Sequence, residues 1–135
     1  MRTRNQSGVT SRSILVVEDQ EDMCAMLRTQ LLDAGYRVVT ARNGRDAVKA
    51  WGRESFDLVL TDILMPDRDG IELMGDMRKT RPDLPIVAMS GGGRAPAAYY
   101  LKLARLLGAK AILEKPFSKE QLLMTVAFAL PDEGG

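Results

Sequence analysis

Five polar side chains stand at the ends of short apolar runs, where charged groups are unusual. In chain order they are Glu18 and Asp19 after ILVV, Asp62 closing LVLTD, Ser90 closing PIVAMS, and Lys115 closing KAILEK. Some carboxylates act as nucleophiles that form aspartyl phosphates, so Asp62 is a candidate acceptor. Clustered carboxylates raise one another's pKa unless a cation is present, and Mg²⁺ takes one or two carboxylates together with phosphate oxygens. Asp19 and Asp62 are therefore candidate Mg²⁺ ligands, with Glu18 acting through water.

A transferred phosphoryl group also needs its negative charge neutralised. Lys115 offers an ammonium and Ser90 a hydroxyl donor for the equatorial oxygens. Each residue alone has an ordinary explanation, because an aspartate at a strand end is most often a cap or turn residue and an acidic pair before a helix usually complements the helix dipole. Their conjunction at the ends of four predicted strands favours one phosphoryl-transfer site.

Alternating apolar runs and amphipathic segments must position these side chains. Strands are predicted over 14–17, 36–41, 58–62, 85–90 and 110–115, and helices over 23–34, 43–51, 70–80, 95–107 and 118–130. Continuously apolar strands are typical of sheets covered on both faces, so the pattern predicts an α/β fold with a doubly wound parallel sheet. Ligands of such sheets bind beyond the carboxyl ends of the strands, where the polar side chains are expected to converge.

Local signals mark the ends of several predicted helices. Asn43 is a candidate N-cap, Ser118 and Gln121 have the spacing of a capping box, and Gly35 and Gly108 are candidate stops. Within the first helix, a core stripe is expected at Met23, Leu27, Leu31 and Ala34, with Cys24 lying off it.

Length and composition limit the possible functions. The chain has 135 residues, of which 45% are hydrophobic, so we expect one domain over 14–130, a flexible leader over 1–13 and a short tail over 131–135 without an output domain. Nineteen basic and eighteen acidic residues give a net charge of +1, which favours neither nucleic acid nor an acidic membrane surface. The absence of histidine excludes histidine-ligated zinc and a histidine base.

The single cysteine and the apolar runs bear on the compartment. Cys24 cannot form an internal disulfide, which suits a reducing cytoplasm. The N-terminal segment has no apolar core of a signal peptide, and no run approaches the roughly 18 apolar residues of a membrane span. We therefore expect a cytoplasmic protein.

The motifs VVED, LTDILMPDRDG, AMS and EKPF, in this order and spacing, closely resemble the receiver domain of two-component response regulators. The likeness extends from residue 14 to about residue 130. It implies a flavodoxin-like (βα)5 fold with strand order 2-1-3-4-5. It also implies that Asp62 accepts a phosphoryl group from a histidine kinase or histidine phosphotransferase. Such a protein is a signalling phospho-acceptor, which catalyses its own phosphorylation and dephosphorylation, and not an enzyme in the usual sense.

The same resemblance implies roles for the other residues of the site. Asp19 and Asp62 would ligate Mg²⁺ directly, the backbone carbonyl of Leu64 would complete the protein ligands, and Glu18 would be the second member of the acidic pair. Ser90 would be the switch hydroxyl. Lys115 would pair with the phosphate, and its bond to Pro116 is usually cis in this family.

Three positions depart from the family pattern. Ile112 stands where the family typically has an aromatic residue that swings inward on phosphorylation, so a rotamer switch there is not expected. The glycines at 91–93 follow Ser90 and favour an easily remodelled loop, which would place the switch in backbone ordering. Leu64 and Gly92 have no polar side chain to hold a hydrolytic water, so we expect no side-chain assistance to dephosphorylation.

Exposed apolar positions on the last two helices indicate how a signal would leave the domain. The helix over 95–107 has one apolar stripe at Tyr100, Ala104 and Leu107, and a second at Tyr99, Leu103 and Leu106, of which only one can face the sheet. On the last helix, Leu122 and Val126 fit the core, which leaves Met124 and Phe128 outward. A downstream protein or a second copy in a homodimer would fit these residues, although scattered surface apolar residues are also normal.

Rival functions come from other classes. A haloacid-dehalogenase-like phosphatase needs a second aspartate two residues after the nucleophile, where this chain has Leu64. A flavin-binding protein needs a hydroxyl- and glycine-rich phosphate loop after the first strand, where EDQEDM would repel phosphate. The stronger alternative is a receiver-like protein-interaction module that works without phosphorylation, for which Ile112 and the triple glycine leave room.

Overall fold

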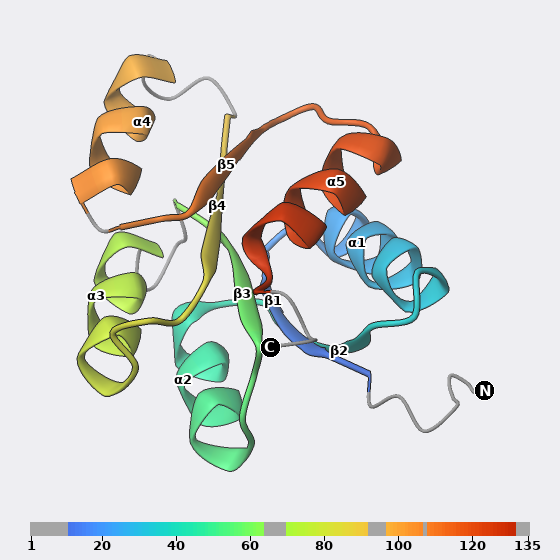
Figure 1. Ribbon diagram of the computed structural model, residues 1–135, viewed down its shortest axis with the longest axis horizontal. Coiled ribbons are helices and arrows are strands. Elements are labelled where there is room, and N and C mark those ends of the chain that lie inside the picture. Colours follow the sequence, from blue (N-terminus) through green and yellow to red (C-terminus); the bar gives the residue numbers. More distant parts are fainter. Residues whose placement is uncertain (1–10, 64–69, 92–96, 107, 132–135) are drawn as a thin grey trace.

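The structure is a computed structural model that describes residues 11–63, 70–91, 97–106 and 108–131, and these form five strands and five helices (Figure 1). In chain order they are β1 (Ser13–Val17), α1 (Glu21–Asp33), β2 (Arg37–Ala41), α2 (Gly44–Arg53), β3 (Leu58–Asp62), α3 (Gly70–Thr80), β4 (Ile86–Ser90), α4 (Ala97–Leu106), β5 (Ala111–Glu114) and α5 (Lys119–Ala129). All strand pairs are parallel, and the strand order is β2-β1-β3-β4-β5. The predicted fold class and strand order are confirmed.

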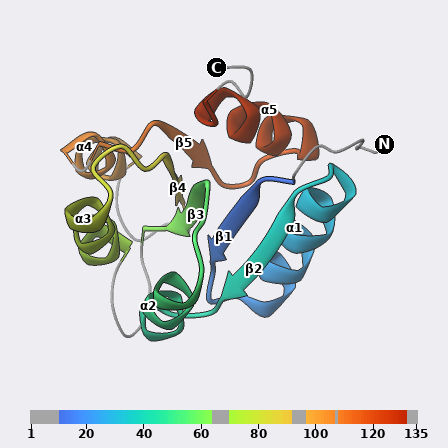
Figure 2. The same cartoon turned by 60° about the horizontal axis from the view of Figure 1, so that its bottom comes forward.

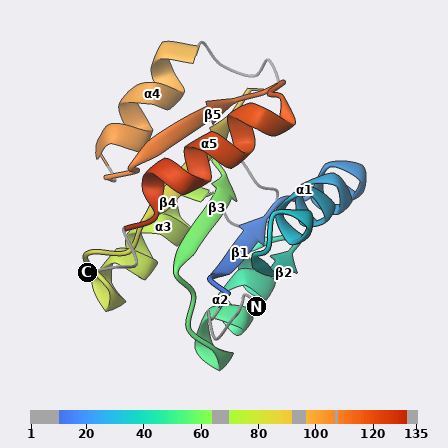
Figure 3. The same ribbon diagram turned by 45° about the vertical axis from the view of Figure 1, so that its right-hand side comes forward.

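Helices cover both faces of the sheet. Figures 2 and 3 show α1 and α5 on one face, with α2, α3 and α4 on the other. Alternate residues of β1 serve the two faces, since Ile14 and Val16 pack with α1 and α5 while Leu15 and Val17 pack with α2 and α3. This two-sided burial is the physical reason for the continuous apolar run ILVV.

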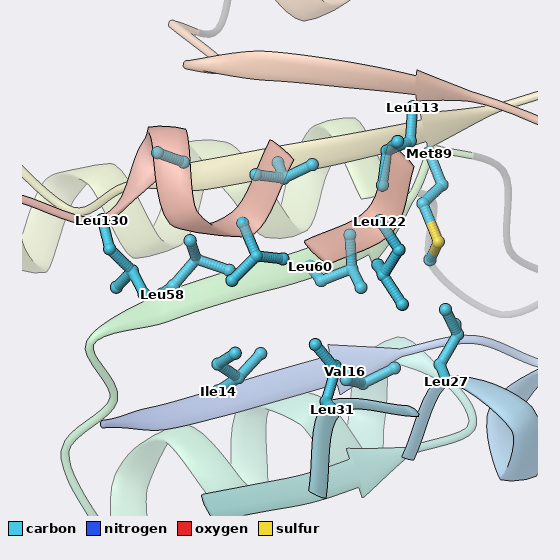
Figure 4. Packing of buried hydrophobic residues seen from close by; sticks show 13 residues of the cluster. Ile14, Val16, Leu27, Leu31, Leu58, Leu60, Met89, Leu113, Leu122 and Leu130 are labelled. Atoms are coloured by element: carbon cyan, nitrogen blue, oxygen red, sulfur yellow. The ribbon is translucent and has the colours of Figure 1, made fainter. Parts of the chain in front are cut away.

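The larger core cluster fills the space between the sheet, α1 and α5 (Figure 4). Leu27 and Leu31 of α1 and Leu122 and Val126 of α5 are fully buried in it. The last two confirm the predicted core face of α5. Residues of β1, β3 and β4 belong to this cluster, so its close packing holds the carboxyl ends of these strands in fixed relative positions.

The structure confirms several of the helix ends that were predicted from local sequence signals. The Asn43 side chain accepts a hydrogen bond of 2.8 Å from the backbone N–H of Asp46. Ser118 and Gln121 form the expected capping box, with reciprocal bonds of 3.0 and 2.8 Å. Gly35 follows α1 with φ of +99°, which a residue with a side chain rarely adopts.

The buried stripe of α1 differs from the predicted one. Cys24, Leu27 and Leu31 form the buried face, whereas Met23 is only half-buried and Ala34 is exposed. Cys24 is 6% exposed, although the sequence pattern placed it off the core stripe. The rotation of a helix about its axis depends on how it packs against the sheet, and two adjacent apolar residues leave that rotation undetermined in the sequence.

Within the part of the chain that the structure describes, no helix combines the length and the apolar character needed to span a membrane.

Candidate functional site

Four strands deliver polar residues to one edge of the sheet. Glu18 follows β1, Asp62 ends β3, Ser90 ends β4, and Lys115 follows β5. Strand register brings them level, because Val17 pairs with Thr61, Asp62 with Met89, and Ser90 with Glu114. In a parallel sheet these carboxyl ends lie side by side, so residues far apart in the sequence meet at this edge.

Lys115 joins two of the acidic residues directly. Its Nζ donates hydrogen bonds of 2.8 Å to Oε1 of Glu18 and 2.9 Å to Oδ2 of Asp62. The side chains are 17%, 0% and 12% exposed, respectively, so water screens these ion pairs little. Burial lowers the pKa of the Lys115 ammonium, but the hydrogen bonds to Glu18 and Asp62 outweigh burial and raise it overall. The ammonium therefore stays charged beside the Asp62 carboxylate.

Glu18 is held from two sides in a fully buried position. Its Oε2 accepts a hydrogen bond of 3.1 Å from the backbone N–H of Gln20, while Oε1 faces Lys115. Burial raises the pKa of the Glu18 carboxyl, and the negative charge of Asp62 adds to this, whereas Lys115 and the Gln20 N–H oppose it. The charge of the buried Glu18 carboxylate is thus supported by the Lys115 ammonium and the Gln20 N–H.

The three acidic side chains form a compact cluster. Glu18, Asp19 and Asp62 each offer a carboxylate oxygen, and these atoms lie within 4.8 Å of one another. Together with Lys115 they make a group of three acidic side chains and one basic side chain. The single ammonium can balance only one of the three potential negative charges. A hard divalent cation with oxygen ligands suits such a donor set, and the cluster fits the predicted Mg²⁺ site. The Leu64 carbonyl, predicted as a further ligand, lies outside the described residues.

Ser90 connects the ends of β4 and β5. It is 5% exposed, and its carbonyl oxygen accepts a hydrogen bond of 2.8 Å from the backbone N–H of Lys115. The Lys115–Pro116 peptide is cis, as the family resemblance implied. Ser90 and Lys115 are thus brought together at the same edge as Asp62.

Sequence reasoning missed two groups that support the acids. The backbone N–H of Gln20 holds Glu18, and the buried hydroxyl of Thr61 donates a hydrogen bond of 3.0 Å to the carbonyl oxygen of Asp62. A backbone N–H carries no residue-type signal. Thr61 could have been noticed as a hydroxyl residue inside an otherwise apolar strand.

The predicted switch residue Ile112 belongs to β5, and the predicted interface residues belong to α4 and α5. Ile112 is partly buried and packs against the small core of Ile63, Ala88 and Ala104. The exposed large apolar side chains described on α4 and α5 are Tyr99 at 52% exposure, Leu106 at 73%, Met124 at 73% and Phe128 at 67%. On α4, Ala104 is 1% exposed and faces inward, whereas Tyr99 and Leu106 of the other predicted stripe are exposed. The side chains of Tyr100 and Leu103, and all of Leu107, lie outside what the structure describes.

Comparison with protein families and curated sequences agrees with this geometry. Residues 14–127 match the family described as the response regulator receiver domain. The transcriptional regulatory protein GlrR of Escherichia coli K12 is 32% identical over 117 residues, which is 87% of this chain and 26% of the relative. The alkaline phosphatase synthesis transcriptional regulatory protein PhoP of Bacillus subtilis is 34% identical over 113 residues, 83% of this chain and 45% of that protein. The chain spans about a quarter to a half of the length of such relatives.

Solved structures give a similar result for the fold. The chemotaxis response regulator CheY4 of Vibrio cholerae has a TM-score of 0.81 and 30% identity, covering 90% of this chain and 100% of that one. A CheY-like receiver domain protein from Methanospirillum hungatei has a TM-score of 0.80 and 27% identity, covering 88% and 93% of the two chains. These neighbours share the fold over nearly their whole length.

Proposed function

Because this chain belongs to the response regulator receiver domain family of two-component signalling, we propose that it accepts a phosphoryl group on Asp62 from a histidine kinase or a histidine phosphotransferase. The observation that carries the proposal is the Asp62 carboxylate, which lies 2.9 Å from the Lys115 ammonium inside a cluster of three acids. The receiver domain is a signalling phospho-acceptor module, and its family partners are histidine kinases.

In the proposed reaction a carboxylate oxygen of Asp62 attacks the phosphorus atom of a phosphohistidine on the donor. The new P–O bond forms as the P–N bond breaks, and the imidazole nitrogen leaves with the electron pair. Mg²⁺ held by Asp19 and Asp62, with Glu18 acting through water, would neutralise charge on the phosphoryl oxygens. Lys115 supplies the neighbouring positive charge, and the Ser90 hydroxyl donates to a phosphoryl oxygen.

The fate of the phosphoryl group and the signal are also part of the proposal. Leu64 and Gly92 have no polar side chain that could hold a hydrolytic water. Hydrolysis of the phosphorylated Asp62 therefore proceeds without their assistance. The exposed apolar side chains of α4 and α5, above all Met124 and Phe128, would carry the signal to a downstream protein or a second copy. Their role is that of a contact surface in the cytoplasm, with no nucleic acid or membrane bound directly.

The test is the intact mass of the protein after incubation with acetyl phosphate and Mg²⁺. Wild type is expected to gain one phosphoryl group, while Asp62→Asn gains none. Asp33→Asn serves as the matched control. Asp33 is exposed and is the last residue of α1, a helix whose first residue follows the acidic pair closely. A gain that survives in Asp62→Asn would refute the assignment of the acceptor.

The second candidate function is protein interaction without phosphorylation. It is favoured by Ile112, which stands where the family typically has an aromatic residue, and by the glycines at 91–93, whereas the intact Asp62, Ser90 and Lys115 argue against it. If wild type binds Mg²⁺ but takes up no phosphoryl group from acetyl phosphate or from a histidine phosphotransferase, this alternative replaces the first.

A further inference from the structure

The ends of β4 and β5 touch through their main chains at Gly91 and Lys115. Gly91 has φ of +124°, which residues with a side chain rarely adopt. A Cβ atom placed on Gly91 would lie 3.0 Å from Cβ of Lys115, 3.2 Å from its carbonyl oxygen and 3.4 Å from its backbone nitrogen. The first two separations are tighter than ordinary contacts of a Cβ atom, so Lys115 would have to move by a few tenths of an ångström to admit a side chain at this position.

Lys115 is therefore fixed at both ends of its side chain. Its backbone N–H is bonded to the Ser90 carbonyl at 2.8 Å, with the bare Cα of Gly91 against it. Its Nζ must reach Glu18 at 2.8 Å and Asp62 at 2.9 Å from that anchor. A shift at the main chain moves the anchor from which one ammonium must keep two hydrogen bonds, each within a narrow range of distance.

We propose that Gly91 is a positioning residue for Lys115, because its missing side chain lets the end of β5 approach β4 closely enough for Nζ to span Glu18 and Asp62. The role in phosphoryl transfer rests on the proposed function, whereas the positioning of Lys115 does not. The inference also explains why the residue after the switch hydroxyl is a glycine without invoking loop mobility.

A second glycine provides a matched control for backbone strain. Gly35 also has a positive φ, +99°, but a Cβ built there meets nothing within 4 Å. Gly35→Ala therefore reproduces the conformational strain of Gly91→Ala without the contact with Lys115. Both variants are compared only after urea unfolding shows a cooperative transition. If Gly91→Ala unfolds too easily, all variants are measured in sucrose, which favours the compact state.

The first test measures the reactivity of the Lys115 amine and needs no phosphorylation. The metal-free proteins are treated with an amine-acetylating reagent, and mass spectrometry follows the modified peptide over time. Gly91→Ala is expected to raise the labelling rate of Lys115 several-fold, while Gly35→Ala leaves it at the wild-type rate. Equal rates in wild type and Gly91→Ala, or an equal increase in both variants, would overturn the inference.

The second test measures phosphorylation by acetyl phosphate in the same variants and applies once wild type is phosphorylated. Gly91→Ala is expected to lower the rate by about tenfold, because small misplacements of a charge-stabilising group are costly. In a Lys115→Ala background the same substitution should change nothing further, since Gly91 acts through Lys115. Fully additive effects would overturn the inference. An unphosphorylated wild type with the labelling difference intact would instead refute the proposed function and leave the positioning of Lys115 established.

Discussion

Removing the Lys115 ammonium tests the electrostatics of the acidic cluster most directly. Lys115→Met keeps most of the aliphatic stem but leaves Glu18, which is fully buried, and Asp62 without the cation between them. Removing one partner of a buried ion pair typically costs about 3–5 kcal/mol, because the other charge stays desolvated. Glu18 can limit this loss by taking up a proton.

The pH determines how far protonation of Glu18 can reduce the loss of stability. Burial already raises the pKa of Glu18 from its ordinary 4.5, and the loss of Lys115 removes a bond that opposes the rise. At about 1.4 kcal/mol per pH unit, keeping Glu18 neutral costs at most about 3.4 kcal/mol at pH 7, and about 1.4 kcal/mol at pH 5.5. The folded variant then binds more protons than the unfolded chain, so its stability falls as the pH rises above about 4.5. We expect a loss near 3 kcal/mol at pH 7 that shrinks to about 1 kcal/mol at pH 5.5.

Urea unfolding in the presence of EDTA, followed by the fluorescence of Trp51, measures both values. Lys110→Met is the control. Lys110 is exposed and directly precedes β5, which Lys115 directly follows, so its substitution should change the free energy of unfolding by less than about 0.5 kcal/mol. A loss below about 1 kcal/mol at pH 7 would refute the reasoning. So would an equal loss at both pH values, since that would show that Glu18 is not the group left uncompensated.

Packing, thiol chemistry and capping give three further predictions. Leu122 is fully buried, so Leu122→Ala should lower the free energy of unfolding in urea by about 2–5 kcal/mol. Met124 is 73% exposed, so Met124→Ala should lower it by less than about 0.5 kcal/mol. Similar losses in both variants would contradict the orientation of α5. Burial raises the pKa of the Cys24 thiol, so a thiol reagent should label the folded protein far more slowly than the urea-unfolded chain. Ser118→Ala removes the capping box and should cost about 1 kcal/mol, whereas Ser118→Asp, which keeps an acceptor, should cost less.

Features that depend on a few neighbouring residues were predictable from the sequence. The apolar runs marked the strands because a strand buried on both faces has no polar side to show, and Asn43 and Ser118 marked helix starts because a cap acts within three residues. The polar residues at strand ends were predictable as a group for a topological reason. Parallel strands bring their carboxyl ends to one edge, so the meeting of Glu18, Asp62 and Lys115 follows from the strand order.

What only the tertiary structure decided depends on rotation and on distances of a few ångströms between segments far apart in the chain. The sequence could not say that Cys24 is buried beside Leu27 and Leu31 while Met23 is only half-buried, because helix rotation follows the fit of side chains against the sheet. It offered Lys115 as a partner for phosphate, yet the same ammonium bonds Glu18 and Asp62, residues 97 and 53 positions away. The contact of Gly91 with Lys115 arises in the same way, because the residue type permits close approach but only the packing of β4 beside β5 determines what lies there.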